Sequence, residues 1–190
     1  MTMQWRNRRG IALRIRRVRP DDAPMLRWGF AQLSQETLYK RFFASVHQIP
    51  EELLRKVCNP NPARDHVLVA MRNDGFQEWP VGLGRFYVSP TGRRCEFALL
   101  VGDRWQGQGI GHRLLDALIA EACRRGLERI EGLVLADNRE MLQLAQARGF
   151  SVLESDEGPT VSLMRLELKA LGWRHRLRYR AWALLGRLPE

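Results

Sequence analysis

A glycine-rich turn is the part of this sequence whose residue types are best suited to bind a ligand. Gly107, Gly109 and Gly111 occupy alternate positions, and their missing side chains let another molecule approach the backbone. The apolar run from Phe97 to Val101 before the turn has the length of a buried strand. After the turn, apolar residues recur at helical spacing from Ile110 onward. A turn at a helix N-terminus directs several N–H groups at one point, so we expect an anion site, most commonly for phosphate.

The spacing of the glycines excludes two common phosphate-binding loops. A Walker A loop requires Lys after its last glycine, whereas His112 follows Gly111. A dinucleotide-binding fingerprint that begins at Gly107 requires a third glycine where this histidine stands. The pattern that fits is Gln-x-x-Gly-x-Gly, formed by Gln106, Gly109 and Gly111. The alternative is that the glycines serve only tight packing of the strand against the helix.

The composition is that of a globular domain. The chain has 190 residues, of which 45% are hydrophobic and 27% charged, and this is enough for one domain with a core. No apolar run is long enough to span a bilayer, and no apolar signal segment follows the basic N-terminus. We therefore expect a cytoplasmic protein.

The cysteines, histidines and net charge favour an anionic partner over a metal. Cys58, Cys95 and Cys123 are odd in number and form no C-x-x-C pair, so we expect reduced thiols. The four histidines share no metal-ligand spacing, so no metal is implied. The net charge of +10 comes almost wholly from arginine and would attract a polyanionic cofactor or an acidic partner. No nucleic-acid recognition motif accompanies this charge.

The remaining pattern alternates strands and helices around the turn. Strands are predicted at 11–19, 66–71, 81–88, 93–101, 129–135, just after 150, and at 161–168, and helices at 20–33, 34–43, 50–58, 110–125 and 138–148. This order predicts an α/β fold with a central mixed, mostly antiparallel sheet flanked by helices.

The turn in this setting resembles the acetyl-CoA motif of the GNAT superfamily of N-acetyltransferases, where it holds the pyrophosphate of coenzyme A. The resemblance covers residues 11–168 and includes a second motif, formed by Ala136, Asn138, Arg139, Met141, Leu144, Gly149 and Phe150. Three segments, 33–43, 95–101 and 103–111, resemble more narrowly the acetyltransferase domain of bacterial Pat-type protein lysine acetyltransferases. Such enzymes often carry a large acyl-CoA-synthetase-like or nucleotide-sensing region, which we do not expect in a chain of this length.

The resemblance implies a GNAT fold in which the parallel strands 93–101 and 129–135 splay apart to admit the pantetheine arm of acetyl-CoA. It implies acetyl-CoA as the cosubstrate and these cofactor-binding residues: Leu99, Leu100, Val101, Gln106, Gly107, Gln108, Gly109, Ile110, Gly111 and Asn138. Asn138 also stands directly before a predicted helix, so a role as its N-cap is an equal alternative.

The resemblance places the catalytic base of the family at Glu96. A lysine amine has a pKa of about 10.4 and must lose a proton before it can attack a thioester. The alternative for Glu96 is structural: if the turn near Pro90 is tight, Arg85 lies across the hairpin and the two side chains form a cross-strand ion pair. A backbone N–H within 99–101 is expected to stabilise the oxyanion.

One position departs from the family pattern. Many GNAT enzymes place a tyrosine four residues before the Gly-Phe step, where it protonates the leaving thiolate, and this chain has Ala145 there. Either water or another group replaces the tyrosine, or the thiolate leaves unaided, because a thiol with a pKa of about 8.5 is a tolerable leaving group.

We therefore predict an N-acetyltransferase that moves an acetyl group from acetyl-CoA directly to an amine, above all a protein lysine side chain. The alternatives are a small-molecule amine acetyltransferase and a non-catalytic acyl-CoA-binding regulatory module. Residues 1–168 are predicted to form the GNAT acetyltransferase domain, and 169–190 a basic amphipathic C-terminal tail. We expect the tail to pack on the body or on a second subunit of a homodimer; contact with an anionic membrane surface is the less favoured alternative.

Overall fold

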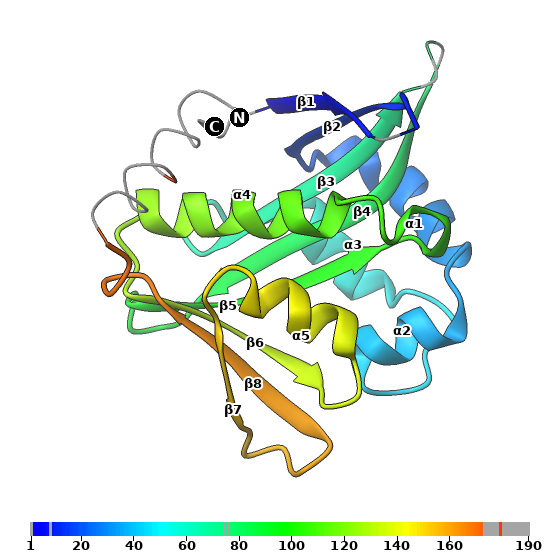
Figure 1. The fold of residues 1–190 in the computed structure, drawn as a ribbon. Helices are drawn as coiled ribbons and strands as arrows, with labels where there is room; N and C mark the ends of the chain where they lie inside the picture. The colour runs from blue at the N-terminus through cyan, green and yellow to red at the C-terminus, as the bar shows by residue number, and fades with distance from the viewer. Residues whose placement is uncertain (1, 8, 74, 76, 173–178, 180–190) are drawn as a thin grey trace. The chain divides into compact units, whose positions relative to one another are not determined.

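The computed structural model describes residues 2–7, 9–73, 75, 77–172 and 179 (Figure 1). Most of the predicted C-terminal tail therefore lies outside the described residues. The strands are β1 (Thr2–Arg6), β2 (Ala12–Arg17), β3 (Asp65–Asn73), β4 (Glu78–Val88), β5 (Arg94–Val101), β6 (Arg129–Leu135), β7 (Ser151–Glu154) and β8 (Val161–Glu167). The helices are α1 (Ala23–Ala31), α2 (Gln35–Phe42), α3 (Glu51–Cys58), α4 (Ile110–Arg124) and α5 (Arg139–Gln146), with 3-10 turns η1 (Pro20–Asp22) and η2 (Asp103–Trp105).

The strands form a single mixed sheet in the order β1-β2-β3-β4-β5-β6-β8-β7, flanked by helices (Figure 1). β5 pairs with β6 in parallel, whereas the pairs β1–β2, β2–β3, β6–β8 and β7–β8 are antiparallel. This is the α/β architecture predicted from the sequence. None of the described helices combines the length and the apolar character needed to cross a membrane.

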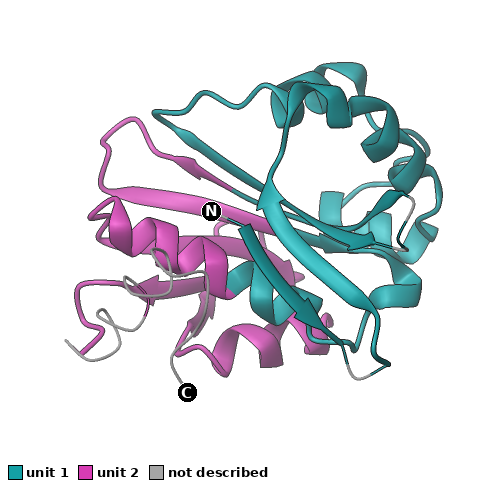
Figure 2. Cartoon of the chain, turned by 90° about the horizontal axis from the view of Figure 1, so that it is seen from above, with its two compact units in different colours: residues 1–85, 99–115 teal, residues 86–98, 116–190 magenta. Residues whose placement is uncertain are grey.

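The chain divides into two compact units, drawn in different colours in Figure 2. Unit 1 consists of Met1–Arg85 and Leu99–Leu115, and unit 2 of Phe86–Ala98 and Asp116–Glu190. Unit 1 contains the glycine turn, and unit 2 contains Glu96 and Asn138.

The core of unit 1 holds α1 and α3 on one face of β2 and β3. Leu54 and Val57 of α3 pack with Val69 and Met71 of β3, all of them buried. Beside this core, the guanidinium of Arg16 makes two hydrogen bonds of 2.7 Å to the carboxylate of Asp22, which is also buried. Because a buried charge is stable only when it is paired, this contact fixes the start of α1 against β2.

Two glycines of β4 let the first turns of α4 approach the sheet. A Cβ atom on Gly82 would lie 3.2 Å from Cδ1 of Leu114, and one on Gly84 would lie 3.1 Å from Cδ2 of Leu99. Leu114 is itself fully buried. These glycines therefore set how closely the helix that follows the turn packs on β4 and β5.

Unit 2 contains a matched aromatic residue and glycine on neighbouring strands. Phe97 of β5 covers Gly132 of β6 so closely that a Cβ on the glycine would lie 2.6 Å from the ring. Phe97 also packs against Phe150, with 5.4 Å between the ring centroids. The β5–β6 ladder ends at the pair Glu96–Glu131, although both strands continue beyond it. The predicted splay of these parallel strands agrees with this early end.

The N-terminal strand β1 was not predicted from the sequence. It pairs antiparallel with β2, and Met3 is buried. The connecting turn is closed by Asn7, whose Oδ1 accepts hydrogen bonds from the N–H groups of Arg9 (3.0 Å) and Ile11 (2.9 Å). Gly10 has a φ of 76°, which a residue with a side chain seldom adopts. The predicted first strand, 11–19, is accordingly the second strand of a hairpin.

Candidate functional site

The glycine turn occupies residues 106–109, between η2 and α4 in unit 1. Gly107 and Gly109 have φ values of 69° and 80°, in the left-handed region that favours glycine. A Cβ atom added to either residue would meet no atom within 4 Å, so both face open space. The sequence therefore places glycine where the backbone must turn and where a ligand can come close.

The turn presents unused backbone N–H groups at the start of α4. The hydrogen bond from the Arg113 N–H to the Gly109 carbonyl, 3.2 Å long, opens the helix, so the N–H groups of Ile110 and Gly111 precede it. Within the described part of the chain, the N–H groups of Gly107, Gln108 and Gly109 donate to no backbone carbonyl. Together with the positive end of the helix dipole, these groups fit an anion such as a diphosphate.

The side chains of the two glutamines of the turn bond to residues outside it. Nε2 of Gln106 donates to Oγ1 of Thr37 (3.0 Å) and to the Val101 carbonyl (3.2 Å). Gln108 accepts a hydrogen bond of 2.7 Å from Nδ2 of Asn7. Its own Nε2 donates to the Arg104 carbonyl at 2.7 Å. Both side chains thus hold the turn in shape, which leaves ligand binding to the backbone.

Asp103 ties the turn to the N-terminus of α2. Its Oδ2 accepts from the Ser34 N–H (2.9 Å), and its Oδ1 accepts from the hydroxyls of Ser34 (2.5 Å) and Thr37 (2.8 Å). Burial opposes ionisation of this carboxyl, but the three donors outweigh burial and lower the pKa of Asp103 below its ordinary value. We call the set Ser34, Thr37, Asp103 and Gln106 the Asp103 clamp.

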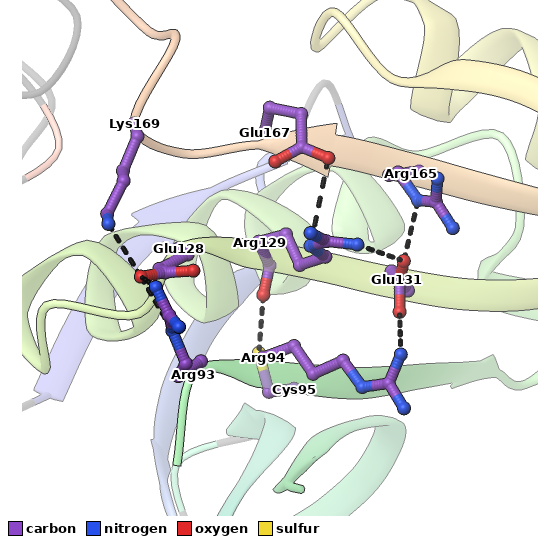
Figure 3. Close-up of polar contacts among 9 residues, drawn as sticks. All are labelled: Arg93, Arg94, Cys95, Glu128, Arg129, Glu131, Arg165, Glu167 and Lys169. Carbon is purple, nitrogen blue, oxygen red and sulfur yellow. Dashed lines mark hydrogen bonds and ion pairs between the residues drawn. The ribbon is translucent and has the colours of Figure 1, made fainter. Parts of the chain in front are cut away.

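Glu96 is exposed on β5 and stands in register with Glu131 of β6. Glu131 is held by arginines, with contacts of 2.6 Å to Arg165, 3.8 Å to Arg129 and 3.9 Å to Arg94 (Figure 3). The side chain of Glu96, in contrast, forms no hydrogen bond or ion pair with any described residue. Its carboxylate is therefore available to another molecule.

The alternative for Glu96, a cross-strand ion pair with Arg85, is not formed. The hairpin is closed by hydrogen bonds from the Ser89 N–H to the Arg94 carbonyl (2.8 Å) and from the Gly92 N–H to the Ser89 carbonyl (2.9 Å). Counting two residues from the Ser89–Arg94 pair along each strand places Tyr87 opposite Glu96. The loop is longer than the tight turn that an Arg85–Glu96 pair requires. The strand register is therefore shifted by two residues, from Arg85 to Tyr87 opposite Glu96. Neither Arg85 nor Glu96 takes part in an ion pair with a described residue.

Of the residues predicted near the pantetheine arm, Asn138 has a structural role, whereas none is assigned to the side chains of residues 99–101. Oδ1 of Asn138 accepts a hydrogen bond of 3.2 Å from the Met141 N–H, so Asn138 is the N-cap of α5. Leu99, Leu100 and Val101 are half-buried at the end of β5. Ala145 is fully buried and offers no side-chain donor. Contacts of Asn138 and of residues 99–101 with a ligand stay predictions.

The sequence analysis missed the contacts that Ser34 and Thr37 make with Asp103. Ser34 is the first residue of the predicted helix 34–43, and as the N-cap of α2 it accepts the Thr37 N–H at 3.2 Å. The one sequence signal was that segments 33–43 and 103–111 both resemble the same group of enzymes. The hydrogen bonds of the clamp give a physical reason for the two segments to occur together.

Cys58 and Cys95 are poor nucleophiles. Burial raises the pKa of the Cys95 thiol to about 12, and burial also raises that of Cys58. No group of three or more His, Cys, Asp or Glu side chains among the described residues is arranged to hold a metal ion.

Comparison with known proteins agrees with the observed fold, and the matched family model covers the residues of the turn. Residues 32–150 match the model of the acetyltransferase (GNAT) family. Acetyltransferase PA5475 of Pseudomonas aeruginosa is 27% identical over 154 residues, which are 81% of this chain and 83% of that protein. Acetyltransferase Pat of Mycolicibacterium smegmatis is 33% identical over 145 residues, which are 76% of this chain but only 43% of Pat.

Two solved structures share the fold. The GNAT domain of S. lividans PAT has a TM-score of 0.78 at 24% identity, with 87% of this chain and 96% of that one covered. The acetyltransferase yncA of Salmonella typhimurium, solved with acetyl-CoA, has a TM-score of 0.65 at 22% identity, covering 82% and 94%. The family match spans most of the chain, including β5, the glycine turn and α4, and the chain therefore belongs to the GNAT family of acetyltransferases.

Proposed function

We propose that this protein transfers an acetyl group from acetyl-CoA to the side-chain amine of a protein lysine. The observation that carries the proposal is the arrangement along β5 and the turn after it. This one stretch supplies a carboxylate without an internal partner, Glu96, and then the open backbone N–H groups of residues 107–111. An amine acetyltransferase needs both a proton acceptor and an anion cradle.

The turn would hold the donor. The N–H groups of residues 107–111 can bind the diphosphate of coenzyme A, and the left-handed glycines leave room for it. Bound in this way, acetyl-CoA supplies the activated acetyl thioester. Residues 99–101 would hold the pantetheine arm through backbone groups of β5, and one of their N–H groups would stabilise the oxyanion that develops at the carbonyl.

Glu96 would act as the general base. The incoming ammonium group must lose a proton, and a carboxylate without an internal partner can accept it directly or through one water molecule. Tyr87, opposite Glu96 on β4 and exposed, would share this face with the acceptor. Because Ala145 provides no acid, the leaving thiolate would take its proton from solvent.

The choice of a protein lysine rests on the sequence resemblance to Pat-type enzymes and on the 33% identity to a protein named Pat. A cytoplasmic location is consistent with Cys58 and Cys95, which are buried and not joined in disulfides. Small-molecule amines are the alternative acceptors, and the acceptor panel described next tests them.

The test is release of free thiol from acetyl-CoA by the purified protein with a panel of acceptors. The panel contains acyl-CoA synthetases, histone-like basic proteins, polyamines and aminoglycosides. We expect release with a protein acceptor and a new acetyl-lysine detected by mass spectrometry. Release with polyamines or aminoglycosides alone would assign a small-molecule acetyltransferase. Tight acetyl-CoA binding without release on any acceptor would assign a non-catalytic binding module.

A further inference from the structure

We propose that Asp103 is a positioning residue that couples ligand binding at the glycine turn to the ordering of helix α2. This inference rests on the proposed function, because it takes the turn to be the coenzyme A site. The coupling runs through the Asp103 clamp, whose four residues all belong to unit 1.

The clamp is a continuous chain of hydrogen bonds from the turn to the helix. The Gln106 amide donates to the Thr37 hydroxyl at 3.0 Å, and the Thr37 hydroxyl donates to Asp103 at 2.8 Å. Asp103 also accepts both the N–H and the hydroxyl of Ser34, the N-cap of α2. Thr37 stands at the centre, since its single hydroxyl is both acceptor and donor.

The turn has few other restraints in its first half. Gln106 directly precedes Gly107, and the backbone N–H groups of residues 107–109 bond to no backbone carbonyl among the described residues. The Gln106 side chain therefore restrains the entrance to the turn, while the Gln108 side chain restrains its second half through Asn7 and Arg104. A ligand that orders the turn must also order Gln106, and through Thr37 it must restrain the first turn of α2.

The charge of Asp103 explains why hydroxyl and amide donors are used here. A carboxylate accepts strong hydrogen bonds from neutral donors, which stabilise its charge without removing it. The Ser34 N–H and the two hydroxyls take up that charge at the positive end of α2. Among the described residues, no cationic side chain bonds to Asp103, so the clamp does not use the arginines of unit 1.

The length of α2 makes it responsive to this restraint. The helix has eight residues, and its C-cap, Phe43, has a φ of 57°, in the left-handed region. A short helix with a strained end depends on its N-terminal contacts for stability. Tyr39 and Phe43 are also exposed, so packing of these two rings contributes little to holding the helix.

The experiment measures amide hydrogen exchange in α2 with and without free coenzyme A, and coenzyme A affinity by calorimetry. In the unaltered protein we expect coenzyme A to slow exchange at residues 35–43 by about threefold or more. Thr37→Val keeps the branched shape but removes the hydroxyl. This variant should lose the ligand-induced slowing and bind coenzyme A about threefold to tenfold more weakly. Because linkage is reciprocal, the ligand-induced slowing and the affinity should fall together.

Two further variants separate coupling from simple loss of helix stability. Thr37→Ser retains the hydroxyl and should restore both the slowing and the affinity. Glu36→Gln removes the exposed Glu36–Lys40 ion pair on the same helix, 2.5 Å long, and should keep the ligand-induced slowing even if exchange is faster throughout. If acceptor turnover is measurable, Thr37→Val should raise the KM for acetyl-CoA while kcat changes by less than about twofold.

The outcomes are distinguishable from failure of the proposed function. If the unaltered protein does not bind coenzyme A, the proposed function fails and the coupling falls with it. If coenzyme A binds but α2 exchange does not respond, the proposed function stands and the coupling is overturned. Equal responses in the unaltered protein and in folded Thr37→Val would overturn it as well.

Discussion

The glycine turn of unit 1 and the charged sheet face of unit 2 satisfy their carboxylates in opposite ways. Asp103 beside the turn is satisfied by one amide and two hydroxyls. On and beside β5, β6 and β8, Glu131 and Glu128 are instead matched by arginine and lysine side chains (Figure 3). The first arrangement leaves an anion cradle open, and the second leaves Glu96 as a carboxylate without an ion-pair partner among the described residues.

This difference shows how functional groups can be separated from structural ones. The cationic partners of Glu128 are well exposed, so its ion pairs contribute little to stability and can change at small cost. Asp103 is exposed, and each donor that it loses leaves its charge less satisfied. The groups that remain after the internal partners are assigned, namely Glu96 and the turn amides, are the ones available for chemistry.

The largest expected effect comes from Glu96→Gln. This change removes the proton acceptor without breaking an internal contact, so kcat should fall by about 100-fold or more. Coenzyme A affinity and thermal stability should stay close to those of the unaltered protein. Thiol-release kinetics, calorimetry and thermal melts measure the three quantities.

Glu131→Gln is the matched control, because Glu131 is the in-register neighbour of Glu96 and is held by Arg165. It should lower stability by about 1 kcal/mol and leave kcat within a few-fold of the original value. If Glu131→Gln abolished turnover while Glu96→Gln did not, the assignment of the base would be reversed.

A smaller effect is expected from Gly109→Ala. An alanine at a φ of 80° costs about 1–2 kcal/mol of stability, and its methyl group would project into the open space of the cradle. Coenzyme A affinity should therefore fall about tenfold or more, as measured by calorimetry. Gly126→Ala serves as the control, since Gly126 has a φ of 72° and equally open surroundings but lies at the other end of α4. Equal losses of affinity in both variants would show that backbone strain, and not the cradle, is responsible.

The smallest effect concerns Glu128, which forms contacts of 2.6 Å with both Arg93 and Lys169. Hydrogen bonds from these side chains lower the pKa of Glu128 from 4.5 to about 2. A depressed pKa adds stability above pH 4.5 that is lost as the pH falls toward 2. The melting temperature of Glu128→Gln should therefore be slightly lower than that of the original protein at pH 6. The difference should vanish near pH 2, and a constant difference across this range would contradict the pairing.

Most of the fold could be predicted because its elements have clear local patterns. Apolar runs and caps marked β5, β6, α2, α3 and α4 to within a few residues. β1 was missed because its five residues include only two large apolar side chains, Met3 and Trp5, among basic and polar neighbours. Its alternation becomes meaningful only once β2 is present as a partner.

The site could be predicted only where its residues are close together in the sequence. The turn is contiguous, so its glycines and the helix start were visible together. The Asp103 clamp joins residues separated by 66 and 69 positions, and no pattern in one sequence relates them. The proposed Arg85–Glu96 pair failed because the hairpin register depends on loop length, which residue types around Pro90 and Gly92 did not determine.

The contact between Phe97 and Gly132 restricts how this protein can diverge. The ring occupies the space that any side chain at position 132 would need. A larger residue there is tolerated only if position 97 becomes smaller, so the two positions should co-vary among descendants of this sequence. Phe97 is also the neighbour of Glu96 on β5. A substitution of Gly132 would therefore require a change directly beside the proposed base.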